Sequence, residues 1–249
     1  MHVLSLFSRK GGVGRTVFAV NLAAIFAEQG LRVAVLECDP QNTLSQHFDD
    51  LDAHTRGWAH TLLPDSHAEP VHWSPRDNLM IIPFGSIGSA QRLIVEQALA
   101  AQPQRLAEFI RAPFLADVDV MLIDTPGGYS VYSDQAERVA SAALSIWLCD
   151  AASQKAFIGS ERRVLPVACA HRHIINQINA SKGSRRVLMK RWRELVGDEL
   201  LPTPVHQDEL VSDALHEGTT VTWYAKYSQA AHDLQGVATW LRQEWLADV

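Results

Sequence analysis

Short hydrophobic runs alternate along the chain with longer segments whose apolar residues recur every three or four positions. This alternation is typical of βαβ units and predicts an α/β fold, a three-layer α/β/α sandwich with a mostly parallel central sheet. The expected strands are residues 3–7, 32–38, 79–83, 118–124, 143–149 and 173–178. The expected helices are residues 16–29, 90–111 (with Pro103 as a candidate break), 134–141, 155–163, 185–196, 208–216 and 229–246.

Local patterns refine this outline. Residues 33–36 and 121–123 are continuously apolar, as strands covered by helices on both faces need to be. Gly30 follows the first long helix, where we expect a left-handed C-terminal cap. Residues 49–73 have weak periodicity and predict a surface excursion with one short helix near Trp58. No repeat or linker divides the sequence, so we expect residues 1–249 to form a single domain.

Composition and charge favour a soluble globular protein. The 249 residues are 47% hydrophobic, and 22 basic against 28 acidic residues give a net charge of −6, which argues against a general attraction to nucleic acid or anionic lipid. The three cysteines are expected to be reduced core thiols, and the histidines show no metal-ligand spacing. With no signal-peptide pattern and no apolar run near the ~20 residues of a membrane span, a cytoplasmic protein is expected.

A glycine-rich segment, SRKGGVGRT at residues 8–16, lies between the first expected strand and the first expected helix. Glycines there let the backbone fold tightly and direct several N–H groups at one anion, and the helix N-terminus adds the positive end of its dipole. Thr16 is the hydroxyl that would hold magnesium in such a loop. The segment therefore predicts a site for nucleotide phosphates.

The usual pattern G-x-x-x-x-G-K-[ST] is not met, because Arg9 replaces its first glycine and Arg15 its lysine. The segment instead resembles the deviant pattern K-G-G-x-G-K-T of the ParA/MinD/NifH family of ATPases, with Lys10 as the early signature lysine. The resemblance spans almost the whole chain and implies a P-loop NTPase fold, ATP and Mg²⁺ as ligands, and a homodimer that encloses the nucleotide. It implies that Lys10 acts catalytically on the partner's nucleotide; the alternative is a solvated loop charge.

Arg15 is the main departure from the family pattern. A guanidinium is planar, longer and forked, whereas the ammonium of lysine is a compact point charge. Nucleotide binding is expected to survive, because a guanidinium still binds phosphate oxygens. A charge misplaced by about 1 Å can slow a reaction ~10²-fold, so we expect slow or absent ATP hydrolysis. Whether the chain is an enzyme stays open.

Acidic residues end two of the central strands, at the sheet edge where such folds bind ligands. The segment ECDPQ at residues 37–41 resembles the family's D-x-D-P-Q, which implies that Asp39 orients the attacking water beside magnesium and that Glu37 supports the phosphate loop. A turn-forming role is the alternative for Asp39. Asp124 would hold magnesium through water, and the loop at residues 125–128 would sense the γ-phosphate.

The resemblance also indicates where the base binds. Asn176 corresponds to an asparagine that hydrogen-bonds adenine in the family; a helix cap or turn is an equal alternative. The loop with Pro202 and Pro204 is expected to flank the base. The residues assigned to the nucleotide are thus Lys10, Gly11, Gly12, Val13, Gly14, Arg15, Thr16, Val17, Asn176, Pro202 and Pro204, and those assigned to the metal are Thr16, Asp39 and Asp124.

Three further stretches, residues 57–63, 82–85 and 200–209, resemble BcsQ, a ParA-like family encoded with bacterial cellulose synthases. This resemblance implies an ATP-sandwich dimer that recruits or positions subunits of the cellulose secretion apparatus, such as BcsR-like and BcsE-like proteins. It implies a cytoplasmic protein that its partners bring to the inner membrane or the cell pole.

Two other branches of the family are alternatives. A DNA-partitioning ATPase needs a basic surface, and one expected helix carries a basic run. Charge runs of this kind are usually solvated helix faces, and nucleic acid is not the expected partner. That run is Lys182, Arg185, Arg186, Lys190, Arg191 and Arg193, with Trp192 among them. A membrane-cycling regulator like MinD needs a basic amphipathic C-terminal helix, whereas residues 229–246 are amphipathic but not basic.

Two groups of large apolar residues remain to be assigned to a partner surface or to the core. Tyr129 and Tyr132 lie just after the loop that would sense the γ-phosphate, and they are candidates either for partner contact or for ordinary packing. Trp240 and Leu241 in the last helix are expected to pack on the sheet.

Overall fold

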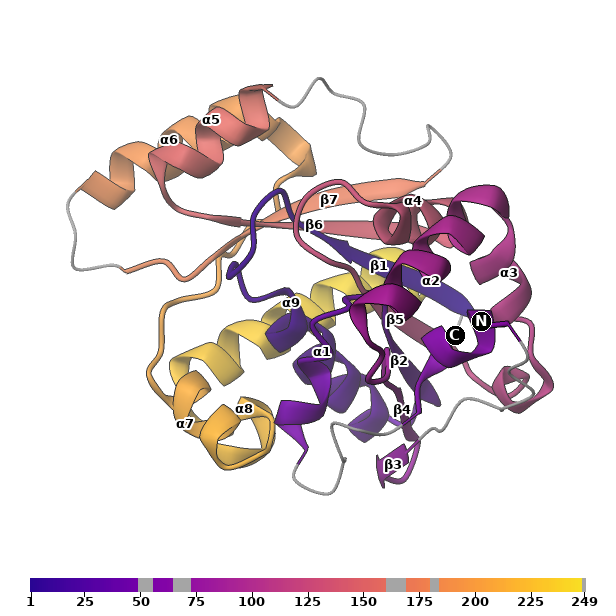
Figure 1. Ribbon diagram of the computed structural model, residues 1–249. Helices are drawn as coiled ribbons and strands as arrows, with labels where there is room; N and C mark the ends of the chain where they lie inside the picture. The colour runs from indigo at the N-terminus through magenta and orange to yellow at the C-terminus, as the bar shows by residue number, and fades with distance from the viewer. Residues whose placement is uncertain (49–55, 65–72, 160–168, 180–183, 248–249) are drawn as a thin grey trace.

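The structure, a computed structural model, describes residues 1–48, 56–64, 73–159, 169–179 and 184–247. Its strands form one seven-stranded sheet in the order β3-β4-β2-β5-β1-β6-β7 (Figure 1). Neighbours pair in parallel except β3, which runs antiparallel to β4. The strands are β1 (His2–Phe7), β2 (Val33–Glu37), β3 (Trp73–Arg76), β4 (Leu79–Ile82), β5 (Val120–Asp124), β6 (Ala142–Leu148) and β7 (Ala170–Asn176).

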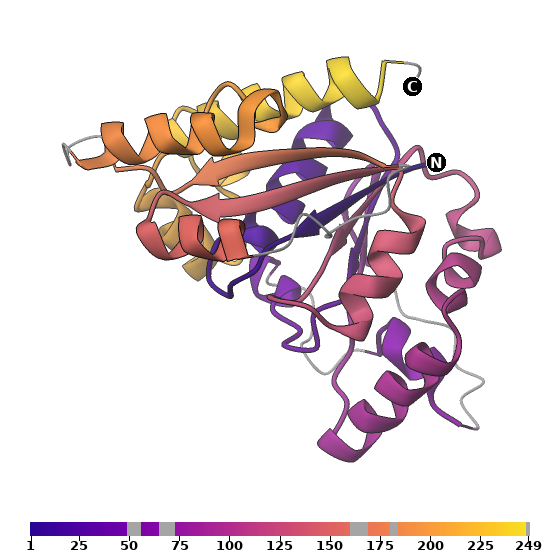
Figure 2. The same ribbon diagram turned by 90° about the horizontal axis from the view of Figure 1, so that it is seen from above.

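Helices cover both faces of the sheet, which confirms the three-layer α/β/α sandwich (Figures 1 and 2). One face carries α1 (Arg15–Glu28), α7 (Leu210–His216), α8 (Val221–Tyr224) and α9 (Gln229–Trp245), and the other carries α2 (Ser89–Ala101), α3 (Arg105–Phe109) and α4 (Val131–Val139). Near the ends of β6 and β7 lie α5 (Ala151–Gly159) and α6 (Ser184–Val196). Short 3₁₀ turns are η1 (Leu44–His47), η2 (Trp58–Leu62), η3 (Pro113–Leu115) and η4 (Gly197–Glu199).

The central strands are buried on both faces, as their continuous apolar runs predict. Every residue of β2 and β5 is buried. Helix α1 packs between the sheet and helices α8 and α9, so it is buried on almost all sides. This explains why its sequence is apolar all round rather than amphipathic.

Helix ends follow local sequence signals. Gly30 has the left-handed φ of 88° expected after α1. The N–H of Gly30 donates to Ala27 O and that of Leu31 to Phe26 O, the paired bonds of a Schellman motif. The expected long helix at residues 90–111 is broken into α2 and α3, with Pro103 in the gap. Helix α4 begins three residues earlier than expected, because the Ser130 hydroxyl caps it by accepting from Ser133 N at 3.1 Å.

Other boundaries differ from expectation. β7 begins at Ala170 rather than residue 173, since its polar first half pairs along β6 despite lacking an apolar pattern. α5 begins at Ala151, four residues before its expected start, and its expected end at residues 160–163 lies outside the described residues. Neither β3 nor α8 was expected. β3 contains Pro75, which argues against a strand, but a proline is tolerated here because β3 lies at the sheet edge.

The expected surface excursion around Trp58 was wrong for the part that the structure describes. The short helix exists as η2, but the Trp58 side chain is fully buried and its indole N–H donates to Glu37 O at 2.6 Å. The N–H groups of Trp58 and Ala59 donate to the carbonyls of Pro83 and Phe84. Tertiary packing therefore draws this aperiodic segment into the core beneath the end of β2.

We predict that Gly57→Ala lowers the free energy of unfolding by about 3 kcal/mol, the scale of overpacking in a core. A Cβ at this position would lie 2.1 Å from Pro83 O, and the backbone beside it has no room to move. Chemical denaturation measures the change. As a control, Gly236→Ala in α9 has nothing within 4 Å of its new Cβ and should stabilise the chain by about 0.5 kcal/mol. Equal effects of the two substitutions would contradict the packing.

Acid should also weaken the fold through His173 on β7. Burial, with help from His171 and Arg172, lowers its pKa from 6.5 to about 3, and the indole of Trp147 donates to its Nδ1 at 3.1 Å. Glu199 lies 3.7 Å from Nε2, but its side chain is 63% exposed and solvent screens its charge. The unfolded chain therefore takes up the proton first, and stability present above pH 6.5 is lost as the pH falls toward 3.

The expected loss of unfolding free energy through His173 between pH 7 and pH 5 is about 2 kcal/mol. His173→Gln keeps an acceptor for the Trp147 indole and removes the titration, so its stability should fall less over this range. Parallel pH profiles of the wild type and the variant would contradict this account.

Candidate functional site

The carboxyl ends of β1, β5 and β2 meet at one edge of the sheet, where the sequence places its phosphate loop and acidic residues. The strand register pairs Asp124 with Leu6 of β1 on one side and with Glu37 of β2 on the other. Cys38 N–H continues the pairing by donating to Asp124 O at 2.7 Å. The sheet itself thus brings residues far apart in sequence to the first turn of α1.

The phosphate loop has the backbone that an anion site needs. Gly12 and Gly14 have positive φ angles of 71° and 94°, a conformation that glycine adopts without strain. Gly14 is the N-cap residue of α1 and, as a glycine, has no side chain that could cap the helix. The N–H groups of its first turn are therefore open to an anionic ligand, which the helix dipole also favours.

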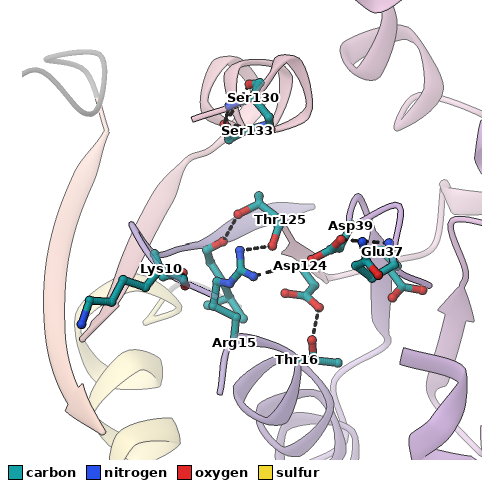
Figure 3. A network of polar contacts seen from close by, with 12 residues as sticks. Lys10, Arg15, Thr16, Glu37, Asp39, Asp124, Thr125, Ser130 and Ser133 are labelled. Carbon is teal, nitrogen blue, oxygen red and sulfur yellow. Dashed lines mark hydrogen bonds and ion pairs between the residues drawn. The ribbon is translucent and has the colours of Figure 1, made fainter. Parts of the chain in front are cut away.

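Arg15 turns inward rather than to solvent, as Figure 3 shows. Its side chain is only 7% exposed, one terminal nitrogen donates to Thr125 O, and the other lies 3.6 Å from Asp39 Oδ2. Its Nε is buried without a partner among the described residues. Burial lowers the pKa of Arg15, while Asp124 and Asp39 oppose that shift. The group stays a cation, because guanidinium does not deprotonate in proteins.

Asp124, Thr16 and Asp39 gather as the metal assignment requires (Figure 3). The Thr16 hydroxyl donates to Asp124 Oδ2 at 2.6 Å, while Asp124 Oδ1 is buried with no partner in the described part of the chain. Burial raises the pKa of Asp124 to about 6, against the pull of Arg15 and Thr16. A hydroxyl, a carboxylate and an orphaned carboxylate oxygen are the donor set that Mg²⁺ or its bound water favours, so the residues fit this metal.

Asp39 has the turn-forming role that was its alternative, and its contact with an attacking water or with magnesium stays a prediction. Its Oδ1 accepts from Gln41 N at 3.0 Å, which closes an Asx turn, and its Oδ2 faces Arg15. Its side chain is 14% exposed, so the carboxylate lies near the site surface.

Glu37 does not support the phosphate loop as expected. Its fully buried carboxylate accepts from Leu44 N at 2.9 Å and from Phe84 N at 3.5 Å, and so joins the loop after β2 to the end of β4. Burial raises its pKa to about 8. The extra methylene relative to aspartate lets the side chain reach these backbone groups. Glu37 therefore helps to position the backbone of residues 37–41, called the Asp39 segment below.

Lys10 is partly exposed and pairs with an acidic residue of the same chain, so its contact with a partner's nucleotide stays a prediction. Its ammonium lies 3.3 Å from Asp150 Oδ1 and 3.4 Å from Oδ2, with the two side chains 33% and 38% exposed. Asp150 also caps the start of α5 by accepting from Ser153 N. Interactions with Ser153 and Lys10 lower the pKa of Asp150 although its burial opposes this. Within one chain, Lys10 points away from the Asp39 and Asp124 side of the loop (Figure 3).

The loop at residues 125–128 packs directly on the phosphate loop. Gly128 N donates to Ser8 O at 2.9 Å, and a Cβ on Gly127 would lie 2.8 Å from Gly11 N. The Thr125 hydroxyl donates to Leu6 O at 2.6 Å. Movement of either loop therefore disturbs the other, as the expected sensing role needs.

A cleft of about 570 Å³ opens beside Gly14 and is large enough for a nucleoside. Val17, Asn176 and Gln177 line it together with residues of the loop before α7. The Asn176 amide nitrogen donates to Val13 O at 2.7 Å, so this residue braces the phosphate loop from within the cleft. Contact between Asn176 and a base stays a prediction.

Pro202 and Pro204 do not line this cleft; residues 205–209 do. The segment runs beside β7, where Leu201 N donates to His173 O and Val205 N to Ile175 O. Prolines have no N–H and so occupy the positions between these bonds. At the cleft wall, His206 Nδ1 lies 2.8 Å from Asp233 Oδ2, a pair that the sequence did not reveal.

A larger hollow of about 970 Å³ lies on the opposite side of the phosphate loop, between α4 and α5. Arg9, Tyr129 and Trp147 are among its walls, but the N–H groups of the first turn of α1 are not. The smaller cleft reaches the α1 end of the phosphate loop at Gly14, whereas the larger hollow reaches its β1 end at Ser8 and Arg9.

A family model described as cellulose biosynthesis protein BcsQ matches residues 1–241. The chain belongs to the BcsQ family. Two members are the cellulose biosynthesis proteins BcsQ of Salmonella typhimurium, 27% identical over 96% of this chain and 94% of that protein, and of Escherichia coli K12, 24% identical over 96% and 94%. The expected resemblance to ParA/MinD-type proteins, and among them to BcsQ, is confirmed.

Solved structures show the same fold. The septum site-determining protein MinD of Pyrococcus horikoshii, complexed with Mg-ADP, superposes with a TM-score of 0.77 at 21% identity, covering 99% of this chain and 97% of that one. The fold of this BcsQ-family chain is thus that of the MinD/ParA P-loop proteins.

The surfaces considered for the other branches are also placed. On α6, Arg186, Lys190, Arg191 and Arg193 are exposed, but Trp192 is fully buried against Trp147 and so is not a surface contact; Lys182 lies outside the described residues. Leu241 is buried as expected, and the apolar face of α9 belongs to the core. No helix that the structure describes has the length and apolar character to cross a bilayer.

The two tyrosines beside the 125–128 loop separate. Tyr132 is buried and packs edge-on against Phe84, whereas Tyr129 is 76% exposed.

Sequence reasoning missed Asp150 as the partner of Lys10, because 140 residues separate them and only the β1–β6 pairing brings them together.

Proposed function

We propose that this BcsQ-family protein binds ATP with Mg²⁺, dimerises around the nucleotide, and in that form recruits or positions subunits of the cellulose secretion apparatus with little or no hydrolysis. The observation that carries the proposal is the meeting, at one sheet edge, of the uncapped first turn of α1 with the orphaned Asp124 oxygen beside Thr16.

The phosphates would lie on the N–H groups of residues 10–17, with Arg15 as the neutralising side chain. The base would enter the cleft beside Gly14 and Asn176. Thr16 and Asp124 would hold the metal, with Asp39 beside it, and the metal would neutralise phosphate charge. The choice of adenine over another base rests on the family resemblance.

Dimerisation is proposed from Lys10. It is partly exposed, and Asp150 holds it in the same chain through contacts of 3.3 and 3.4 Å. Such an exposed pair is weak, so little free energy is needed to release the lysine. In a dimer the ammonium would move to the partner's phosphates, which offer more negative charge than one carboxylate.

Weak hydrolysis is proposed from Arg15. Its guanidinium spans Thr125 and Asp39, so it lies among the groups that would orient an attacking water. A forked cation there alters the positions of the charge and the water on which phosphoryl transfer depends. A nucleotide that is held but not turned over suits a lasting clamp.

The partners are proposed from the family. Cytosolic subunits resembling BcsR and BcsE would bind the closed dimer at the inner membrane. The net charge of −6 and the use of the α9 apolar face in the core support recruitment through protein partners rather than direct attraction to lipid or DNA. Tyr129 beside the 125–128 loop is well placed to report the closed form to a partner.

A pull-down from the native cell with and without ATP tests the proposal. The wild type should capture cellulose-apparatus subunits in ATP, and Lys10→Ala should capture far less if closure forms the docking surface. Capture of a DNA-bound centromere protein or of a division regulator in their place would contradict it.

Arg15→Lys should raise ATPase activity by about tenfold, because the compact ammonium restores a positive charge without bridging Thr125 and Asp39. Phosphate release at saturating Mg-ATP measures this. Arg138→Lys, on the exposed face of α4, is the matched control and should leave the rate unchanged. Equal or lower turnover in Arg15→Lys would remove the argument from Arg15.

Asp150→Asn should increase the fraction of dimer at limiting ATP several-fold. The amide oxygen can still cap α5 through Ser153 N, whereas the charge that holds Lys10 within one chain is lost. Light scattering after size exclusion gives the fraction. Asp134→Asn, which breaks a remote ion pair on α4, is the control. A dimer fraction unchanged or lowered by Asp150→Asn would contradict the release of Lys10.

A further inference from the structure

We infer that Arg15 and a divalent metal ion are alternative counter-ions for the same carboxylates, so that Arg15 sets how strongly this site responds to magnesium. The inference rests on the proposed function in one respect, the assignment of Thr16, Asp39 and Asp124 to the metal.

Two contacts, together with the charges of Asp39 and Asp124, place the guanidinium in the cation's position (Figure 3). Arg15 lies 3.6 Å from Asp39 Oδ2, donates to Thr125 O next to Asp124, and interacts electrostatically with both carboxylates. It is 7% exposed, and Asp124 is fully buried. Two buried or nearly buried carboxylates at one edge need a nearby positive charge, and within the part of the chain that the structure describes Arg15 supplies it.

The two cations exclude each other. Magnesium takes oxygen ligands at ~2.1 Å in near-octahedral geometry, with retained waters around it. A metal ion with this shell would approach Asp39 Oδ2, which lies 3.6 Å from a nitrogen of Arg15. The positive charges of the metal ion and the guanidinium would then repel each other. Metal binding at Asp124 and Asp39 therefore requires the guanidinium to withdraw, toward the phosphates when a nucleotide is present.

Exchange of the guanidinium for a metal ion also changes how two loops are joined, because the guanidinium is forked. One nitrogen holds the Thr125 carbonyl while the other faces Asp39, so Arg15 ties the 125–128 loop to the Asp39 segment. A lysine ammonium is a compact point charge and does not present this planar fork. Withdrawal of Arg15 frees Thr125 O, in a loop that packs on Ser8 and Gly11 beside Lys10. Metal exchange is thus transmitted to the proposed dimer face.

The test uses melting temperature without nucleotide, in EDTA and in 10 mM Mg²⁺ at equal ionic strength. Arg15→Met keeps the length and apolar stem but leaves the carboxylates without their cation. Its melting temperature should lie below that of the wild type in EDTA and rise by about 3 °C with Mg²⁺, whereas the wild type should change by less than about 1 °C. Arg138→Met, which breaks an exposed pair on α4, should respond as the wild type does.

Equal responses of the wild type and Arg15→Met to Mg²⁺ would overturn the inference. Should Arg15→Met fail to fold, Arg15→Lys serves instead, with Mn²⁺ affinity read by electron paramagnetic resonance. Mn²⁺ should bind Arg15→Lys at least about fivefold more tightly than the wild type, because the fork that bridges Thr125 and Asp39 is gone. Equal Mn²⁺ affinities would also overturn it.

These measurements separate the inference from the proposed function. A metal response that depends on Arg15, in a chain that takes up no ATP, would refute nucleotide binding and leave the counter-ion exchange standing. If the chain binds ATP but its response to metal does not depend on Arg15, the counter-ion exchange is refuted and nucleotide binding stands.

Discussion

Burial of acidic groups at one edge of the sheet is the constraint on which the rest of this structure depends. The register of β1, β5 and β2 places Glu37, Asp124 and the start of the Asp39 segment side by side. Burial disfavours their charged forms and raises the pKa of Asp124 to about 6 and that of Glu37 to about 8. The fold offsets this cost with backbone donors at Glu37, a hydroxyl at Asp124 and the Arg15 cation.

The same constraint links parts of the molecule that are distant in sequence. Glu37 binds the Leu44 and Phe84 backbones, and Trp58 closes over the Glu37 carbonyl, so residues that resemble BcsQ form the underside of the Asp39 segment. Phe84 in turn packs on Tyr132, just after the 125–128 loop. The loops proposed to sense nucleotide thus share one buried support. This gives a physical reason for a BcsQ-family chain to carry these stretches without their touching a ligand.

Sequence alone predicted the features that local pattern encodes. Continuous apolar runs located β2 and β5, glycines marked the phosphate loop and the C-terminal end of α1, and strand ends located the acidic residues. What it could not predict depends on free-energy differences between distant segments. Whether Arg15 turns inward depends on Thr125 and Asp39, and the partner of Lys10 lies beyond β6. The burial of Trp58 and the edge strand β3 were missed because their segments have no periodic pattern and Pro75 argues against a strand.

The central claim is that the turn after β1 holds a triphosphate. Calorimetric titration of ATP into the wild-type chain, with Mg²⁺ present, tests it most directly. The account predicts saturable binding of one nucleotide per chain, lost when Gly14→Val places a branched side chain against Asn176 at a positive φ. Absence of binding heat for the folded wild type at millimolar ATP, with no displacement of a fluorescent ATP analogue, would contradict it.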